Sequence, residues 1–115
     1  TMLGFELRHV GINCADEAEA ERTAQMFSTV FGWEYKPGNS SVFSGTAVEC
    51  MKAPYLGERG HIAVGTNNVD RAMYHLGLHG ITFDESTRKT DAKGKTKAIY
   101  LKDSFCGFAV HLVQK

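Results

Sequence analysis

The sequence lacks a cysteine framework. Its three cysteines, Cys14, Cys50 and Cys106, are scattered along the chain and form no CxxC pair. Small secreted domains that depend on disulfides normally carry an even number of cysteines at regular spacing. The cysteine usage therefore fits a reducing cytoplasm better than secretion.

The chain also lacks long apolar runs and a net charge. No apolar stretch approaches the roughly 20 residues that cross a bilayer, and no basic segment followed by an apolar one marks a secretory signal. Thirteen basic residues balance thirteen acidic ones, so no net field attracts nucleic acid or an anionic membrane. The densest basic run, residues 88–97, lacks interleaved aromatics, and we interpret it as the solvated tip of a hairpin. We expect neither nucleic acid nor a membrane as a partner.

The composition is that of a folded globular protein, with 43% hydrophobic and 23% charged residues. At 115 residues the chain is long enough for one core and too short for two, so residues 1–115 are expected to form a single domain. Predicted strands lie close to both ends. This arrangement fits either a minimal protein with one extra residue before Met2 or a domain cut from a longer polypeptide.

The first half of the chain predicts a strand, a helix and three shorter strands. Residues 5–13 alternate as a strand does, and the apolar residues that follow recur at helical spacing. Asp16 can cap this helix at its N-terminus, and Gly32 can end it. Turn residues then divide short strands, the last of which is expected over residues 46–51.

The second half repeats this order of elements. A strand is expected over residues 60–65, followed by a helix that Asn67 or Asn68 caps and Gly80 ends. Three strands come next, the last two joined by a turn over residues 103–107. Neither half could bury its sheet alone. The sequence therefore predicts an α+β fold of two β-α-β-β-β modules, about 4–52 and 59–115, joined by a linker over 53–58.

Four metal-capable side chains occupy matching places in the two modules. His9 and His61 lie in the opening strands, and Glu49 and His111 lie in the closing strands, each preceded by Ala-Val. A pseudo-twofold axis between the modules would bring them into one cavity. Imidazole nitrogen and carboxylate oxygen are ligands for divalent zinc, nickel, cobalt, manganese and iron. A single strand histidine is more often structural than a ligand, but the matched set of four favours a metal site.

These segments carry a resemblance to a known family. The opening strands RHVGIN and GHIAVG, the closing strands AVECMK and DSFCGFAVHLVQK, and the repeated module order resemble the vicinal oxygen chelate superfamily, which includes glyoxalase I, methylmalonyl-CoA epimerase and extradiol dioxygenases. The resemblance implies a curved glyoxalase-like sheet around a central site. It also implies metal ligands at His9, Glu49, His61 and His111, and a homodimer.

A narrower resemblance concerns the glyoxalase-like domain at the C-terminus of some bacterial keto-hydroxyglutarate and keto-deoxy-phosphogluconate aldolases. It implies that an aldolase domain is covalently fused to this chain.

The closing strand departs from the family pattern in two ways. The family turn usually reads Asp-Pro-Asp-Gly and is followed four residues later by Glu, whereas Asp103 and Gly107 here have one extra residue between them and His111 replaces the Glu. In glyoxalase I that Glu helps to move the substrate proton, so its replacement argues against that reaction in its familiar form. Glu49 is then the first candidate for the catalytic base, and His111 is the second.

The charge of the predicted site indicates its substrate. A divalent ion held by three neutral imidazoles and one carboxylate keeps one positive charge, which favours a small anion such as a 2-oxo or 2-hydroxy acid bound through adjacent oxygens. Tyr100 is the first choice for a substrate contact, ahead of Trp33, Tyr35 and Phe43.

Three functions fit these residues. The first is lyase or isomerase chemistry of the glyoxalase I type. The second is a non-catalytic domain that binds a ligand or regulates a fused sugar-acid aldolase. The third is an Fe(II) dioxygenase, because two histidines and one carboxylate can be drawn from the same four residues.

Overall fold

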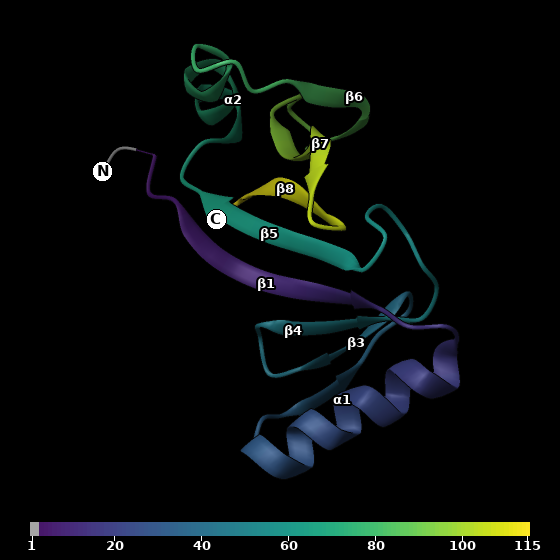
Figure 1. The fold of residues 1–115 in the computed structure, drawn as a ribbon. Coiled ribbons are helices and arrows are strands. Elements are labelled where there is room, and N and C mark those ends of the chain that lie inside the picture. The colour runs from purple at the N-terminus through teal and green to yellow at the C-terminus, as the bar shows by residue number, and fades with distance from the viewer. Residues whose placement is uncertain (1–2) are drawn as a thin grey trace.

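A computed structural model describes residues 3–115 as one α+β sheet structure with two helices, which confirms the predicted fold class. Eight strands form a single curved sheet in the order β2-β3-β4-β1-β5-β8-β7-β6 (Figure 1). The elements in chain order are β1 (Glu6–Asn13), α1 (Glu17–Phe31), β2 (Tyr35–Pro37), β3 (Ser41–Ser44), β4 (Val48–Met51), β5 (Gly60–Thr66), α2 (Val69–Gly77), β6 (Phe83–Thr90), β7 (Thr96–Phe105) and β8 (Phe108–Gln114).

The first helix begins and ends where the sequence predicts. The Asp16 side chain accepts a hydrogen bond from the Glu19 amide at 2.8 Å, and the Glu19 carboxylate accepts one from the Ala15 amide at 2.7 Å. The first bond satisfies an amide that the helix N-terminus leaves free, and the second ties the first turn to the residue before the cap. Gly32 ends the helix in the left-handed conformation, with φ of 76°.

Two sequence-based boundaries in the second module are wrong. Asn68 caps α2 as expected, but the helix ends at Gly77, three residues before Gly80, and the chain continues through turns. The turn expected over 103–107 is also shorter. Strand β7 continues to Phe105, and Cys106 and Gly107 alone form the turn, with φ of 54° and 86°. Two consecutive positive φ angles allow a two-residue hairpin loop, so the flanking residues stay in the ladder.

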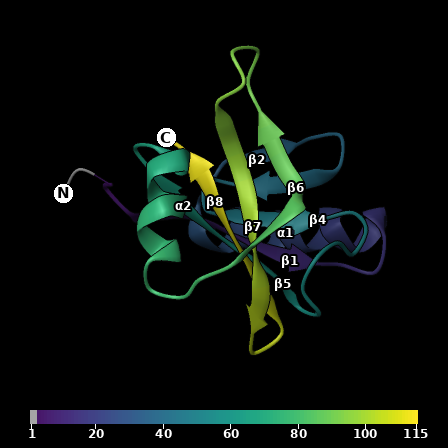
Figure 2. The same ribbon diagram turned by 90° about the horizontal axis from the view of Figure 1, so that it is seen from above.

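The strand registers show the pseudo-twofold relation between the modules. In the parallel pair β1–β4, Gly11 lies opposite Glu49, and in the parallel pair β5–β8, Ala63 lies opposite His111. The antiparallel ladder between β1 and β5 joins the modules, with Gly11 opposite His61 and Ala63 opposite His9. Each opening-strand histidine therefore lies two residues before the residue that faces the closing-strand ligand candidate. Figure 2 shows the sheet from above, with each helix beside its own module.

The core lies between the sheet and the helices and consists of two clusters. Under α1, Val42 and Cys50 pack against helix alanines, and under α2, Ile99 and Leu112 pack in the same way. Cys50 follows Glu49, and Leu112 follows His111. Because successive strand residues point to opposite faces, the polar members of these pairs lie on the face away from the helices.

No helix within residues 3–115 combines the length and the apolar character that crossing a membrane requires.

The helix cap gives a test of this fold. We expect Asp16→Ala to lower the free energy of unfolding by about 1 kcal/mol, because it removes a bond to an otherwise free amide. Urea denaturation monitored by circular dichroism measures the change. Asp103→Ala is the control, since Asp103 is exposed on β7, and it should stay within about 0.5 kcal/mol of the wild type. Equal effects of the two substitutions would contradict the cap.

Candidate metal centre

Four central strands bring His9, Glu49, His61 and His111 together on the face of the sheet away from the helices. The Glu49 Oε1 atom lies 3.2 Å from His9 Nε2 and 3.1 Å from His61 Nε2, and the two Nε2 atoms lie 3.3 Å apart. One ligand-capable nitrogen from each of the three histidines lies within 4.8 Å of the others. The repeat-equivalent positions therefore converge on one place.

Hydrogen bonds can join the three closest atoms, but they cannot use all three contacts among them. Each Nε2 carries at most one hydrogen, and Glu49 Oε1 carries none when the carboxylate is ionised. Two hydrogens can serve at most two of the three edges of this triangle. When both Nε2 atoms donate to Glu49, the contact between the two nitrogens is not a hydrogen bond. A cation between the atoms would instead accept a lone pair from each of them, so the arrangement also suits a cation.

The spacing of these atoms fits a divalent ion. Zinc bonds of about 2.1 Å to nitrogen and oxygen place neighbouring ligand atoms about 3.0–3.4 Å apart in octahedral or tetrahedral geometry. The observed separations of 3.1, 3.2 and 3.3 Å lie in this range. The set of imidazoles and one carboxylate also suits the divalent transition metals expected from the sequence.

His111 is oriented by its own backbone neighbour. Its Nδ1 donates to the Leu112 carbonyl oxygen at 3.2 Å, which leaves Nε2 with its lone pair free. Burial lowers the pKa of His111 to about 4, and nearby His61 and His9 add to this, against the opposite effect of the Leu112 bond. The ring is therefore neutral at pH 7, which is the form that binds a metal.

Glu49 is kept ionised by its neighbours. Burial raises its pKa, but hydrogen bonds from His61, His9 and Ser41 outweigh burial and hold the pKa of the carboxyl well below its usual range. The Ser41 hydroxyl donates to Glu49 Oε2 at 2.7 Å, so Oε1 faces the histidines. Sequence reasoning missed Ser41, whose role depends on the pairing of β3 with β4.

Sequence reasoning also missed Gly11, whose lack of a side chain leaves room for the His61 ring. Gly11 lies between Glu49 on β4 and His61 on β5. A Cβ atom at this position would lie 2.0 Å from Cε1 of the His61 ring, so any other residue would displace the ring. The His61 side chain is 4% exposed, and its Nδ1 has no hydrogen-bond partner among residues 3–115. Its polar contacts are thus made through Nε2, toward the cluster. A glycine inside a strand is the available sequence signal.

A cavity of about 240 Å³ opens over the four residues. Tyr100, the predicted substrate contact, lines this cavity, and its ring centroid lies 4.7 Å from that of His111. Burial raises the pKa of Tyr100 to about 12, and Tyr55 and Glu49 add to the shift, so its hydroxyl is neutral at pH 7 and can donate. Tyr55, from the segment between the modules, also lines the cavity, and sequence reasoning did not select it.

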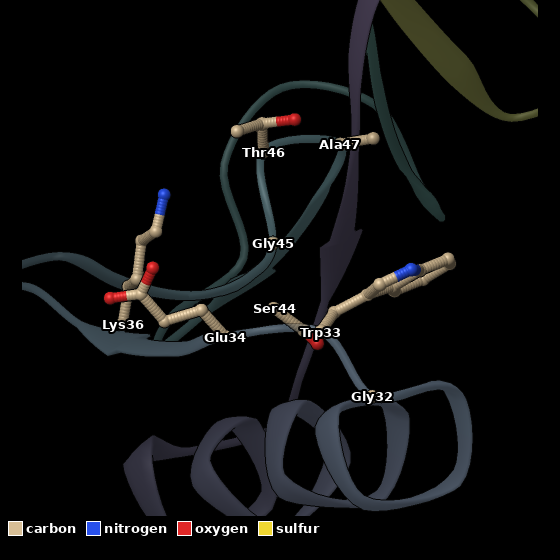
Figure 3. Close-up of a pocket in the computed structure, with 8 residues that line it drawn as sticks. All are labelled: Gly32, Trp33, Glu34, Lys36, Ser44, Gly45, Thr46 and Ala47. Atoms are coloured by element: carbon tan, nitrogen blue, oxygen red, sulfur yellow. The ribbon is translucent and has the colours of Figure 1, made fainter.

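The other aromatic candidates do not line this cavity. Phe43 packs edge-on against the His9 ring at 5.5 Å, and Tyr35 packs against the core under α1. Trp33 lies at a separate hollow of about 460 Å³ near the end of α1 (Figure 3). Its ring stacks with that of Phe31, with centroids 5.1 Å apart.

The interpretation of residues 88–97 as a solvated hairpin tip is wrong at both ends. Strand β6 includes Arg88 and Lys89, β7 begins at Thr96, and the tip comprises only residues 91–95. Lys89 lines the cavity of the cluster. Strand β6 lies at the edge of the sheet, so it lacks the apolar alternation that identifies a half-buried strand.

Comparison with known proteins establishes the fold. No family model matches the chain, and no curated protein matches it. Among solved structures, a methylmalonyl-CoA epimerase in complex with methylmalonyl-CoA and NH4+ is 17% identical, covers 100% of this chain and 96% of its own, and gives a TM-score of 0.66.

Two further epimerases show the same likeness. A variant of the Streptomyces coelicolor enzyme, in complex with 2-nitronate-propionyl-CoA, is 18% identical over 96% of this chain and 94% of its own, with a TM-score of 0.65. The Mycobacterium tuberculosis enzyme is 15% identical over 99% of this chain and 89% of its own, with a TM-score of 0.59. The chain therefore has the same fold as these epimerases.

Proposed function

We propose that the chain binds one divalent metal through His9, Glu49, His61 and His111 and acts as an isomerase or lyase on a small 2-oxo or 2-hydroxy acid. The observation that carries the proposal is the triangle of His9 Nε2, His61 Nε2 and Glu49 Oε1, with edges of 3.1–3.3 Å. These atoms are spaced as neighbouring ligands of one shared cation would be.

The metal, when bound, would polarise two adjacent substrate oxygens and acidify the neighbouring C–H. Glu49 would accept the proton, because Ser41 and the two histidines hold it as a carboxylate. His111 is the second candidate for this role, as a neutral imidazole at the edge of the same cavity. The Tyr100 hydroxyl would donate to a substrate oxygen and exclude water on that side.

The epimerase neighbours support chemistry of this class. Methylmalonyl-CoA, bound in one of them, has a C–H between a carboxylate and a thioester carbonyl, and an epimerase removes and returns a proton at such a carbon. At 17% identity the likeness supports the fold alone. The substrate proposed for this chain is therefore argued from the chain's own cavity.

The second candidate is an Fe(II) dioxygenase. His9, His61 and Glu49 form a compact group of two histidines and one carboxylate, the ligand set of non-haem iron oxygenases. Oxygen consumption with a catechol, on the iron-loaded protein, would support this candidate over the isomerase.

A ligand-binding domain without activity is the third candidate: it predicts metal and acid binding without turnover. The homodimer, the cytoplasmic location and the fused aldolase stay predictions.

Metal binding is the first test. We expect the metal-free protein to bind one equivalent of Co²⁺, and we expect His9→Gln and His61→Gln each to weaken binding at least about tenfold, because each removes a ligand. Visible absorption of the bound cobalt reports the titration. His75→Gln is the matched control, because His75 is exposed on α2. Absence of binding, or equal weakening by His75→Gln, would contradict the site.

Gly11 tests whether the site is preformed. We expect Gly11→Ala to destabilise the fold by about 1–3 kcal/mol and to weaken cobalt binding, because the new methyl group displaces the His61 ring. Thermal unfolding and the same titration measure both effects. Gly77→Ala is the control, because a Cβ there meets nothing within 4 Å. Equal effects of Gly11→Ala and Gly77→Ala would contradict the role of Gly11 in positioning the His61 ring.

Glu49 tests the proton transfer. With metal saturation verified by elemental analysis, we expect Glu49→Gln to slow deuterium incorporation into the methyl group of pyruvate about a hundredfold or more, because an amide cannot accept the proton. Proton NMR in D₂O follows the exchange. A metal-loaded Gln variant that exchanges at the wild-type rate would transfer the role of base to His111.

A further inference from the structure

A second hollow continues from the cavity of the cluster. It measures about 610 Å³ and shares Lys89, Ala98 and His111 with the cavity. Beyond these shared residues, its lining includes Lys97 and Gln114. A ligand bound over the histidines could therefore extend past His111 toward two lysine side chains.

A β-bulge explains why Lys97 lines this hollow. Lys89 lies opposite Ala98, but the next residue, Thr90, lies opposite Thr96, so Lys97 is the extra residue of β7. A bulge turns two consecutive side chains away from strict alternation. Thr96 is buried and donates to Asp70 of α2, whereas Lys97 and Ala98 both line the hollow next to His111.

Neither lysine has an ion-pair partner among residues 3–115. The neighbouring Arg88 differs, because it is paired with Glu85 and Asp70. Among residues 3–115, Glu49 is the only carboxylate that lines the cavity or the hollow. The lysines thus place two uncompensated positive charges on the side of the site toward β6 and β7.

We propose that Lys89 and Lys97 bind a second anionic group of the substrate, so that the substrate is a 2-oxo or 2-hydroxy acid with a distal carboxylate or phosphate. The inference rests on the proposed function, since the acid head is placed at the His9, His61 and Glu49 cluster.

The experiment compares three ligands with the same 2-hydroxy acid head. Lactate has no second anion, 2-hydroxyglutarate adds a carboxylate, and 3-phosphoglycerate adds a phosphate. Isothermal titration of the cobalt-loaded protein at low ionic strength gives the three affinities. We expect at least one dianion to bind about tenfold or more tightly than lactate, and the tighter of the two identifies the distal group.

Lysine variants then locate the preference. We expect Lys89→Gln and Lys97→Gln each to weaken dianion binding about three- to tenfold, while lactate and cobalt affinities are retained. Lys93 lies at the exposed hairpin tip, so Lys93→Gln should leave the dianion, lactate and cobalt affinities unchanged. Added salt should reduce the dianion preference of the wild type more than its lactate affinity.

The outcomes separate the two proposals. If the protein binds no cobalt, or if it binds none of the three acids, the proposed function is overturned and this inference with it. Normal cobalt and lactate binding without a dianion preference overturns this inference alone. This inference is also overturned if Lys89→Gln and Lys97→Gln both retain the dianion preference, or if Lys93→Gln reduces that preference as much as they do.

Discussion

The His61 imidazole lies directly on the backbone of Gly11, and the geometry of the cluster depends on this contact. Gly11 faces Glu49 on one side and His61 on the other, so the strand pairing alone sets which side chains can meet. Without a side chain at Gly11, the ring can lean across β1 until Nε2 lies 3.1 Å from the Glu49 carboxylate. A site built on central strands, with a neighbour fixing each ring, is preorganised.

The balance of charges in the site follows from the same packing. Ser41 and two imidazoles surround the Glu49 carboxylate, so it stays ionised despite its burial. His111 has lost most of its contact with water and stays neutral. One carboxylate and three imidazoles therefore meet in a small volume, with unpaired lysines on one side only. Such a distribution favours a cation at the centre and anions around it.

The sequence predicted the parts of this structure that depend on local chemistry and on the repeat. The cap at Asp16 and the stop at Gly32 are local, and the matching places of His9, His61, Glu49 and His111 follow from the repeat. The bulge at Lys97 could not be predicted, because it is defined by the pairing with β6, a polar edge strand. The hydrogen bond of Ser41 likewise depends on a partner strand. Non-local pairing, rather than composition, decides both.

At the site, the two modules match at His9 and His61 but differ at two other paired positions, where Gly11 corresponds to Ala63 and Glu49 to His111. A cavity with perfect twofold symmetry would hold a bifunctional molecule equally well in either of two opposite orientations. Here one end offers a carboxylate and the other an imidazole beside lysines, so the two orientations differ in energy. The duplicated backbone supplies a symmetric frame, and the two unmatched residues give it a polarity. A substrate would enter with one defined end first, and its proton would leave toward one defined side.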